Sequence, residues 1–208
     1  SLARRIIIYM SQIIKHSIQL FLVFCMPFAA HAATLSLSPA SGTYTVDDTI
    51  TVSVLLDTAG AAIDGVDLHF LRFNASLLEL TDADSTQSGT QVTAGSLMPN
   101  TVQNTVNASA GTIDFSQLTG GGTKFTSNGA EVLVTMQFRV KGSGTASFSF
   151  DATPNSTNDT NVVASVKELL TLAAGASFTL NSKAPAAPPA SSGSFGSGSS
   201  GGGGGGSG

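Results

Sequence analysis

Residues 132–140 read VLVTMQFRV, and this stretch decides the fold class. Apolar side chains recur at every second position, namely Val132, Val134, Met136, Phe138 and Val140. Successive side chains of a β-strand point to opposite faces, so this period of two predicts a strand with one buried face. The residues between them, beginning with Leu133, are then expected on the opposite, solvent-facing side.

A turn and further alternating runs surround this strand. Residues 141–144 read KGSG, and Ala146, Phe148 and Phe150 then recur at period two, which predicts a hairpin partner. Similar short runs continue in both directions at the spacing typical of a β-sandwich or barrel. We predict an all-β domain of nine strands over residues 34–37, 49–56, 65–73, 77–80, 101–107, 112–118, 132–140, 145–150 and 176–180. Residues 164–172 fit either a short helical turn or an irregular strand.

The third of these strands changes its alternation partway along. Val66, Leu68 and Phe70 share one face, whereas Leu71 and Phe73 continue the apolar series with the opposite parity. If both halves are buried, one extra residue must be accommodated, because a shift by one residue turns every side chain to the other face. We therefore predict a β-bulge near residues 69–71.

The two ends of the chain differ in composition from the middle. Residues 1–32 contain a basic region, the apolar run 18–28 and the small-residue sequence 30–32, which predicts a signal peptide, with initiation possible at Met10. An uncleaved membrane anchor is the alternative. Residues 34–180 are expected to form one domain. Residues 181–208, which are rich in Pro and Ala and then in Gly and Ser, predict a flexible linker to a further module, or else a free tail.

Charge and cysteine content narrow the function classes. After residue 33 the chain has thirteen acidic and six basic residues, a net charge of −7. This composition disfavours nucleic acid and a charged membrane surface as partners, since both are bound through Lys and Arg. The only cysteine, Cys25, lies in the apolar N-terminal run, so no disulfide or cysteine-based metal site is expected in the domain.

Signals for catalysis and for cofactors are absent from the sequence. The predicted domain has one histidine, His69, and no Cys/His cluster, phosphate loop or nucleophile elbow. Residues 82–86 read DADST and resemble the start of a calcium loop, but Gln87 and Thr93 occupy the positions where Gly and an acidic residue are required. We predict a non-enzymatic chain without a metal or another cofactor of its own, with a weak calcium site in this loop as the alternative.

Several segments together resemble a known family. Residues 47–54 (DDTITVSV), 63–68 (IDGVDL) and 73–80 (FNASLLEL), followed by 111–115 (GTIDF) and 132–149, resemble in order the strands of cohesin domains. The resemblance covers residues 34–180 and implies a nine-stranded jelly-roll β-sandwich. Cohesins bind dockerin modules, which are small calcium-loaded helical pairs, through one sheet face. The implied function is recruitment of a dockerin-type protein in a polysaccharide-degrading or cell-surface assembly.

The resemblance also implies the position of the binding site. It places Asp67 where cohesins carry an acidic residue that faces dockerin, and Gly65 where many carry Asn; the adjacent strand edge and loop are Leu118, Thr119, Gly120 and Gly121. Calcium is then expected on the partner. The chain is expected to be a monomer, secreted by a bacterium or attached to its surface.

Other interpretations stay open at this point. Asp67 fits equally well a solvent-facing strand residue without a binding role. The alternatives for the domain are a structural or adhesin module and a carbohydrate-binding β-sandwich, although the chain has no Trp and only two Tyr for stacking on sugars. Two departures from the cohesin pattern are Asn74 in place of Asp and Ala75 in place of Pro.

Overall fold

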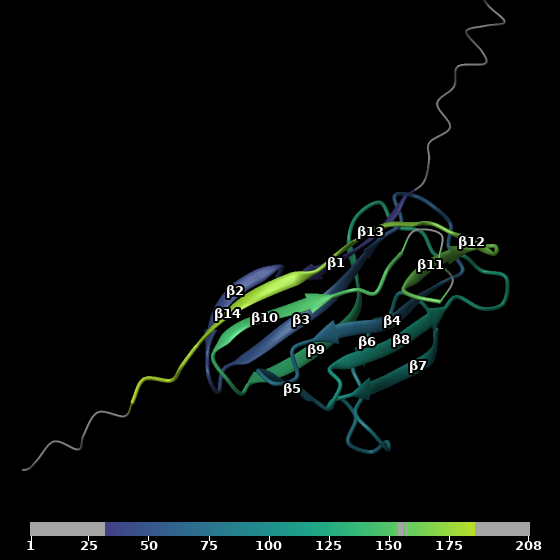
Figure 1. Cartoon of the computed structure of the whole chain (residues 1–208). Helices are drawn as coiled ribbons and strands as arrows, with labels where there is room; N and C mark the ends of the chain where they lie inside the picture. The colour runs from purple at the N-terminus through teal and green to yellow at the C-terminus, as the bar shows by residue number, and fades with distance from the viewer. Residues whose placement is uncertain (1–31, 154–155, 157, 186–208) are drawn as a thin grey trace, which may run out of the picture.

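The computed structural model describes residues 32–153, 156 and 158–185 as two β-sheets packed face to face (Figure 1). Long strands far apart in sequence lie side by side in each sheet, and the chain crosses repeatedly between the sheets. Fourteen strands and no helix occur in this part of the chain. The predicted all-β sandwich with jelly-roll topology is confirmed, with more strands than the nine expected.

The first sheet has the strand order β13-β1-β3-β9-β5, and β6 pairs with β9 beside β5. Pairing is antiparallel except between β1 and β13, which run parallel. Its strands are β1 (Ala33–Ser38), β3 (Thr49–Asp57), β5 (Leu78–Thr81), β6 (Thr93–Ala94), β9 (Glu131–Val140) and β13 (Leu170–Ala174).

The second sheet is built around β4. One edge of β4 pairs along its length with β8, which pairs in turn with β7, and the other edge pairs with β11 and with β10. The sheet continues through β14 to β2 and through β11 to β12. Its strands are β2 (Ser41–Thr45), β4 (Gly65–Phe73), β7 (Asn100–Asn107), β8 (Thr112–Leu118), β10 (Gly144–Ser149), β11 (Asn161–Ala164), β12 (Lys167–Glu168) and β14 (Ala176–Asn181).

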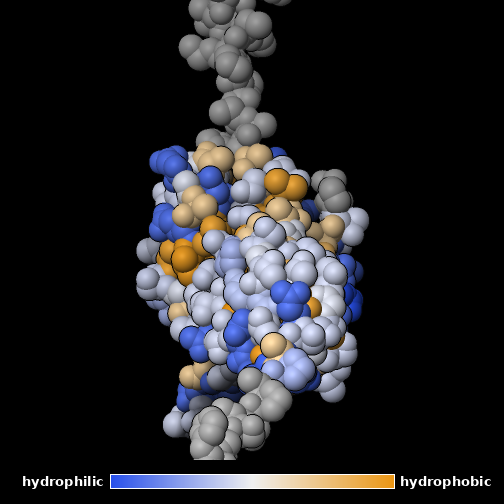
Figure 2. All heavy atoms as spheres, turned by 90° about the vertical axis from the view of Figure 1, so that its left-hand side faces the viewer, coloured by the Kyte–Doolittle hydropathy of each residue, from blue (hydrophilic) through white to orange (hydrophobic). Residues whose placement is uncertain are grey.

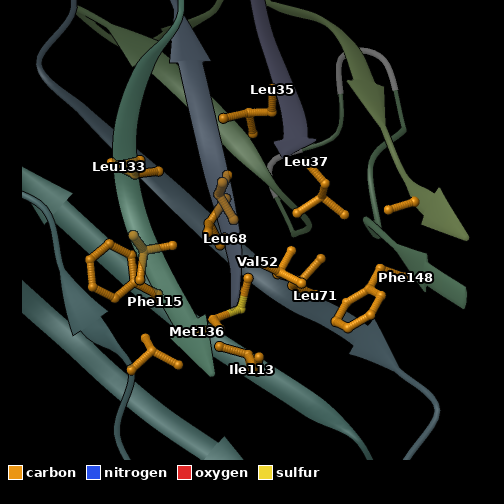
Figure 3. Close-up of a cluster of buried hydrophobic side chains, with 14 of the residues drawn as sticks. Leu35, Leu37, Val52, Leu68, Leu71, Ile113, Phe115, Leu133, Met136 and Phe148 are labelled. Atoms are coloured by element: carbon orange, nitrogen blue, oxygen red, sulfur yellow. The ribbon is translucent and has the colours of Figure 1, made fainter. Parts of the chain in front are cut away.

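The inward faces of both sheets form one continuous core (Figure 3). At one end of it, aromatic rings from four strands pack in sequence. The ring of Phe138 on β9 lies with its centroid 5.0 Å from that of Phe73 and 5.1 Å from that of Phe148, and Phe148 packs edge-on against Phe178 at 5.7 Å. Phe138 comes from the first sheet and the other three from the second, so this cluster joins the two layers.

All nine predicted strands are present, with ends that differ from the predicted ones by at most one residue. Five strands were not predicted with them, namely β2, β6, β11, β12 and β13. The uncertain segment 164–172 forms strands in place of a helical turn, since β12 and most of β13 lie within it. These five strands have two to five residues each and do not carry the alternating apolar pattern that identified the others.

The predicted bulge in β4 is confirmed. Pairing with β8 shifts register between Leu68 and Leu71, so that both side chains are fully buried although they lie three residues apart. One part of the expectation was wrong: Phe70 was placed with the buried residues, but it is 36% exposed. The backbone of Phe70 has φ +51°, a left-handed conformation that turns its side chain away from the core.

A second bulge corrects the interpretation of residues 132–140. Along the β3–β9 pair, Val54 faces Val134 and Leu55 faces Val132, so Leu133 is the extra residue. Leu133 is fully buried and Val132 is 43% exposed, the reverse of what strict alternation predicts. The parity from Val134 to Val140 is as expected, because the irregularity lies at the start of the strand.

The outer surface of the sandwich is mainly polar. Figure 2 views the side on which β2 and β14 lie in Figure 1, and hydrophobic side chains there form small groups among hydrophilic ones. Residues 1–31 of the predicted signal peptide and most of the predicted linker lie outside the described residues. Asn181 still belongs to β14, and the Lys183 ammonium lies 2.9 Å from the Asp47 carboxylate. No helix suited to crossing a bilayer occurs in the described ranges.

Replacing the aromatic ring that joins the two sheets is expected to destabilise the fold strongly. Phe138→Ala should lower the free energy of unfolding by about 3–5 kcal/mol, because the truncated side chain leaves a cavity between packed rings. Urea denaturation measures this. The matched control is Phe70→Ala, which removes the same atoms from an exposed position and should cost less than about 1 kcal/mol. Equal losses in the two variants would contradict the proposed core.

Candidate functional site

Three of the predicted binding residues lie on the outer side of the second sheet. Gly65 at the start of β4 pairs with Leu118 at the end of β8, and Asp67 pairs with Ser116. Val66, which lies between Gly65 and Asp67, points into the core, so its two neighbours face outward. The structure therefore brings Gly65, Asp67 and Leu118 together on one face.

The other three predicted residues form the loop that follows β8. Gly120 and Gly121 are exposed and have φ of +73° and +59°, a conformation that favours glycine. Thr119 differs, because its side chain is buried and its Oγ1 lies 3.0 Å from the carbonyl oxygen of Asp64 and 2.8 Å from that of Thr123. The two glycines thus present backbone to solvent, whereas the Thr119 hydroxyl holds the loop in place.

The Asp67 carboxylate retains free hydrogen-bonding capacity. Ser116 Oγ donates a hydrogen bond of 2.5 Å to Asp67 Oδ1, and Asp67 is half-buried. Asn161 on β11 lies directly opposite Asp67 on its other side. An ionised carboxylate can accept about four hydrogen bonds. Because Ser116 is its only side-chain partner among the described residues, Asp67 is available to donors on a bound molecule.

Gly65 is required by the packing of the strand pair. A Cβ atom at this position would overlap the Leu118 side chain and lie 2.7 Å from the carbonyl oxygen of Gln117. Leu118 therefore covers Gly65 and is still 44% exposed. The glycine acts by letting an apolar side chain lie flat on the sheet next to Asp67.

An ion pair fixes the border of this surface. The Lys124 ammonium bonds the Asp64 carboxylate, whose other oxygen accepts a 2.5 Å hydrogen bond from the backbone N–H of Ser165. The hydrogen bond from Lys124, followed by that from Ser165, lowers the pKa of Asp64. Asp64 thereby ties the loop after β8 to the turn between β11 and β12.

The β4 bulge adds residues that sequence reasoning did not include in the site. The Asp114 carboxylate lies 3.2 Å from His69 Nδ1 and accepts a hydrogen bond from the N–H of Phe70, also at 3.2 Å. The Arg72 guanidinium lies 5.7 Å from the centroid of the Phe70 ring. The break in parity at Phe70 was the available signal for its exposure. We call the outward side chains of Asp67, Phe70, Ser116, Leu118 and Asn161 the Asp67 face.

The arrangement is suited to recognition. His69 contacts the Asp114 carboxylate and the Phe70 ring, and no Ser, Thr or Cys side chain is bonded to its imidazole within the described ranges. Asp82 and Asp84 accept backbone N–H groups of their own turn, including those of Thr86 and Gln91. No cluster of three or more His, Cys, Asp or Glu residues able to hold a metal ion occurs in the described part of the chain.

The fold and this surface define an all-β module whose second sheet presents exposed Leu118 beside the half-buried Asp67 carboxylate on its outer side. No protein-family model and no curated protein matches the chain. Solved structures do match, and cohesins are prominent among them; the chain has the cohesin fold, as the sequence resemblance implied.

Three of these structures illustrate the match. CaCohA2 of Clostridium acetobutylicum, in complex with a variant of CaDoc0917, is 14% identical with a TM-score of 0.55, over 72% of this chain and 100% of that chain. The OlpC cohesin of Clostridium thermocellum, in a cohesin–dockerin complex with Doc435, is 12% identical with a TM-score of 0.54, over 74% of this chain and 96% of that chain. The sixth cohesin of scaffoldin B from Acetivibrio cellulolyticus, in complex with the Cel5 dockerin, is 16% identical with a TM-score of 0.52, over 72% of this chain and 99% of that chain.

The close approach at Gly65 predicts a steric effect on stability. Gly65→Ala should lower the free energy of unfolding by about 1–3 kcal/mol, because the added methyl group displaces Leu118 or the β8 backbone. The matched control is Gly129→Ala, where a Cβ meets no atom within 4 Å and the change should be neutral or slightly stabilising. Denaturant unfolding compares the two. A neutral Gly65→Ala variant would show that the sheet tolerates a side chain here.

The lowered pKa of Asp64 predicts a pH-dependent contribution to stability. Because the folded-state pKa lies below the unfolded value of about 3.9, the contribution is present above that value and is lost as pH falls through the folded pKa. Asp64→Asn should therefore lower the urea midpoint at pH 6 and have little effect near pH 2. Lys124→Met should change the urea midpoint in the same way, whereas the control Lys167→Met should not. If the urea midpoints of the wild type and the three variants depend on pH in the same way, the ion pair does not have this role.

Proposed function

We propose that this chain is an exported, non-catalytic protein-binding module that binds a dockerin-type partner through the Asp67 face. The observation that carries the proposal is the juxtaposition of exposed Leu118 with half-buried Asp67, whose carboxylate has free acceptor capacity. Export is proposed from the order of basic, apolar and small residues in 1–32, and the place of action is then the exterior of a bacterial cell.

The fold supports a protein partner of this kind. The OlpC and scaffoldin B structures described above each pair the cohesin fold with a dockerin, and CaCohA2 was likewise solved with a CaDoc0917 variant. Those partners belong to those proteins. The extension to this chain rests on the shared fold together with the Asp67 face, which lies on the β4–β8 pair where the sequence resemblance places the dockerin contact.

The chemistry of the face specifies what a partner must present. Leu118 and Phe70 are both partly exposed on this face and offer apolar area that a partner could bury. Asp67 requires a hydroxyl, amide or cationic donor opposite it. A helix with an apolar stripe flanked by hydroxyl or basic residues would meet both requirements.

The first test is capture of an exported partner by the immobilised protein, with calcium and with a chelator. The proposal expects calcium-dependent capture of a protein that mass spectrometry identifies as carrying paired calcium loops. Absence of any such protein in both buffers would overturn the proposal and favour a structural surface module.

Substitutions then locate the interface. Leu118→Ala and Asp67→Ala should each weaken binding of the captured dockerin by roughly tenfold or more, as for central interface residues. Matched controls carry comparable changes on the first sheet, where Leu172 is 57% exposed on β13 and Glu131 is exposed on β9. Leu172→Ala and Glu131→Ala should bind normally. Titration calorimetry measures all four, and a loss confined to the control pair would place the interface on the opposite sheet.

A further inference from the structure

A separate groove lies at the edge of the sandwich, between residues 83–94 and the outer strand β7. The groove has a volume of about 480 Å³, within the range of small-molecule sites. One wall includes β6, which belongs to the first sheet, and the other is β7 of the second sheet. The residues that line the groove therefore come from strands of both layers, β6 and β7.

The walls of the groove are held by hydrogen bonds between the two segments. Asn104 on β7 accepts the backbone N–H of Val92 at 2.9 Å and donates to the carbonyl of the same residue at 2.8 Å. A bridge between Thr90 and Val106 adds a further connection. The loop itself is closed by the N–H of Ala83, which donates to the carbonyl of Gln91 at 3.0 Å. The groove is thus preformed.

The lining is dense in uncharged hydrogen-bonding groups. Side-chain amides, hydroxyls, small apolar groups and a single carboxylate contribute to it, from Ala83, Asp84, Gln87, Gln91, Val92, Thr93, Ala94, Thr101, Val102, Gln103 and Asn104. Within the described residues, the side chains of Thr93 and Gln103 make no hydrogen bond, so their donors and acceptors are free for a ligand. Val102 is largely exposed and supplies an apolar surface beside them.

Gln91 is an independent indication of a ligand. The residue is only 7% exposed, and its Nε2 donates to the carbonyl of Ser88 at 2.9 Å. Its Oε1 is buried and accepts no hydrogen bond. Buried polar atoms in native proteins are normally paired, so this unpartnered acceptor, on a residue that lines the groove, indicates a donor that the described residues do not supply.

The charges of the lining restrict the class of ligand. No Lys, Arg or His lines the groove, which disfavours phosphates and other anions. The one carboxylate, Asp84, already accepts hydrogen bonds from Thr86 and Gln87, and the bonds from Thr86 and then Gln87 lower its pKa. It is therefore ionised and satisfied within its own turn. What remains are neutral donors and acceptors beside an apolar side chain.

We propose that this groove is a binding site for a neutral carbohydrate. A sugar ring offers several hydroxyl groups that both donate and accept, together with an apolar C–H face. These match the unpartnered Oε1 acceptor of Gln91, the free groups of Thr93 and Gln103 and the exposed side chain of Val102. The site uses none of the outward residues of the Asp67 face, so it is independent of the proposed partner.

The test is a titration of the ¹⁵N-labelled protein with neutral hexasaccharides of glucose, xylose, mannose and galactose, followed by NMR. The proposal expects saturable shifts of the side-chain amide signals of Gln91, Gln103 and Asn104 with at least one of these sugars. Signals of the Asp67 face should not move. Absence of saturable shifts with all four sugars, or shifts confined to other surfaces, would overturn the site.

A pair of glutamine variants provides the matched comparison. Gln103→Ala should raise the dissociation constant of the bound sugar roughly fivefold, as for the loss of one neutral hydrogen bond. Gln137→Ala removes the same group from an exposed position on β9 of the first sheet and should leave the dissociation constant unchanged. Equal effects of the two variants would contradict the assignment. Sugar binding with normal stoichiometry in Asp67→Ala would separate this site from the partner surface.

Discussion

Strand β4 contributes apolar side chains to the core both before and after a point where the inward-facing residues change from even to odd positions. Leu68 and Leu71 are both fully buried, and a regular strand cannot place residues three apart on one face. The bulge at His69 and Phe70 resolves this conflict by inserting a residue without a partner on β8. Because β4 pairs with β8, β10 and β11, its course determines the register of most of the second sheet.

The same constraint shapes the outer surface. Residues before the bulge keep the pairing of Gly65 with Leu118 and of Asp67 with Ser116, and this pairing places an apolar side chain and a carboxylate next to each other. The bulge itself turns Phe70 outward, and the Phe70 N–H donates a hydrogen bond to the Asp114 carboxylate. Core packing and the candidate binding surface are therefore two consequences of one backbone irregularity.

Except for β7, the sequence predicted the long strands because their buried faces repeat at period two, and it predicted the β4 bulge because the repeat breaks between two apolar runs. It could not predict β2, β6 or β11 to β13, because these strands are defined by pairing with a neighbour and not by a buried alternating face. The Leu133 bulge was missed because Val132 and Leu133 are both apolar, so either could face inward. Gly65, Asp67 and Leu118 were placed together by resemblance, whereas the inward hydroxyl of Thr119 depends on loop hydrogen bonds that no pattern reveals.

Strand β8 connects the two candidate surfaces. Its outward residues Ser116 and Leu118 belong to the Asp67 face, while Gln117 between them points inward and its Nε2 lies 2.9 Å from the carbonyl oxygen of Gly95 and 3.2 Å from Thr101 Oγ1. Thr101 lines the groove, and Gly95 follows its β6 wall directly in sequence. A shift of β8 along its axis would therefore move both surfaces at once. Because β8 pairs with β4 along one edge and with β7 along the other, it connects the two candidate surfaces, which keep separate sets of side chains.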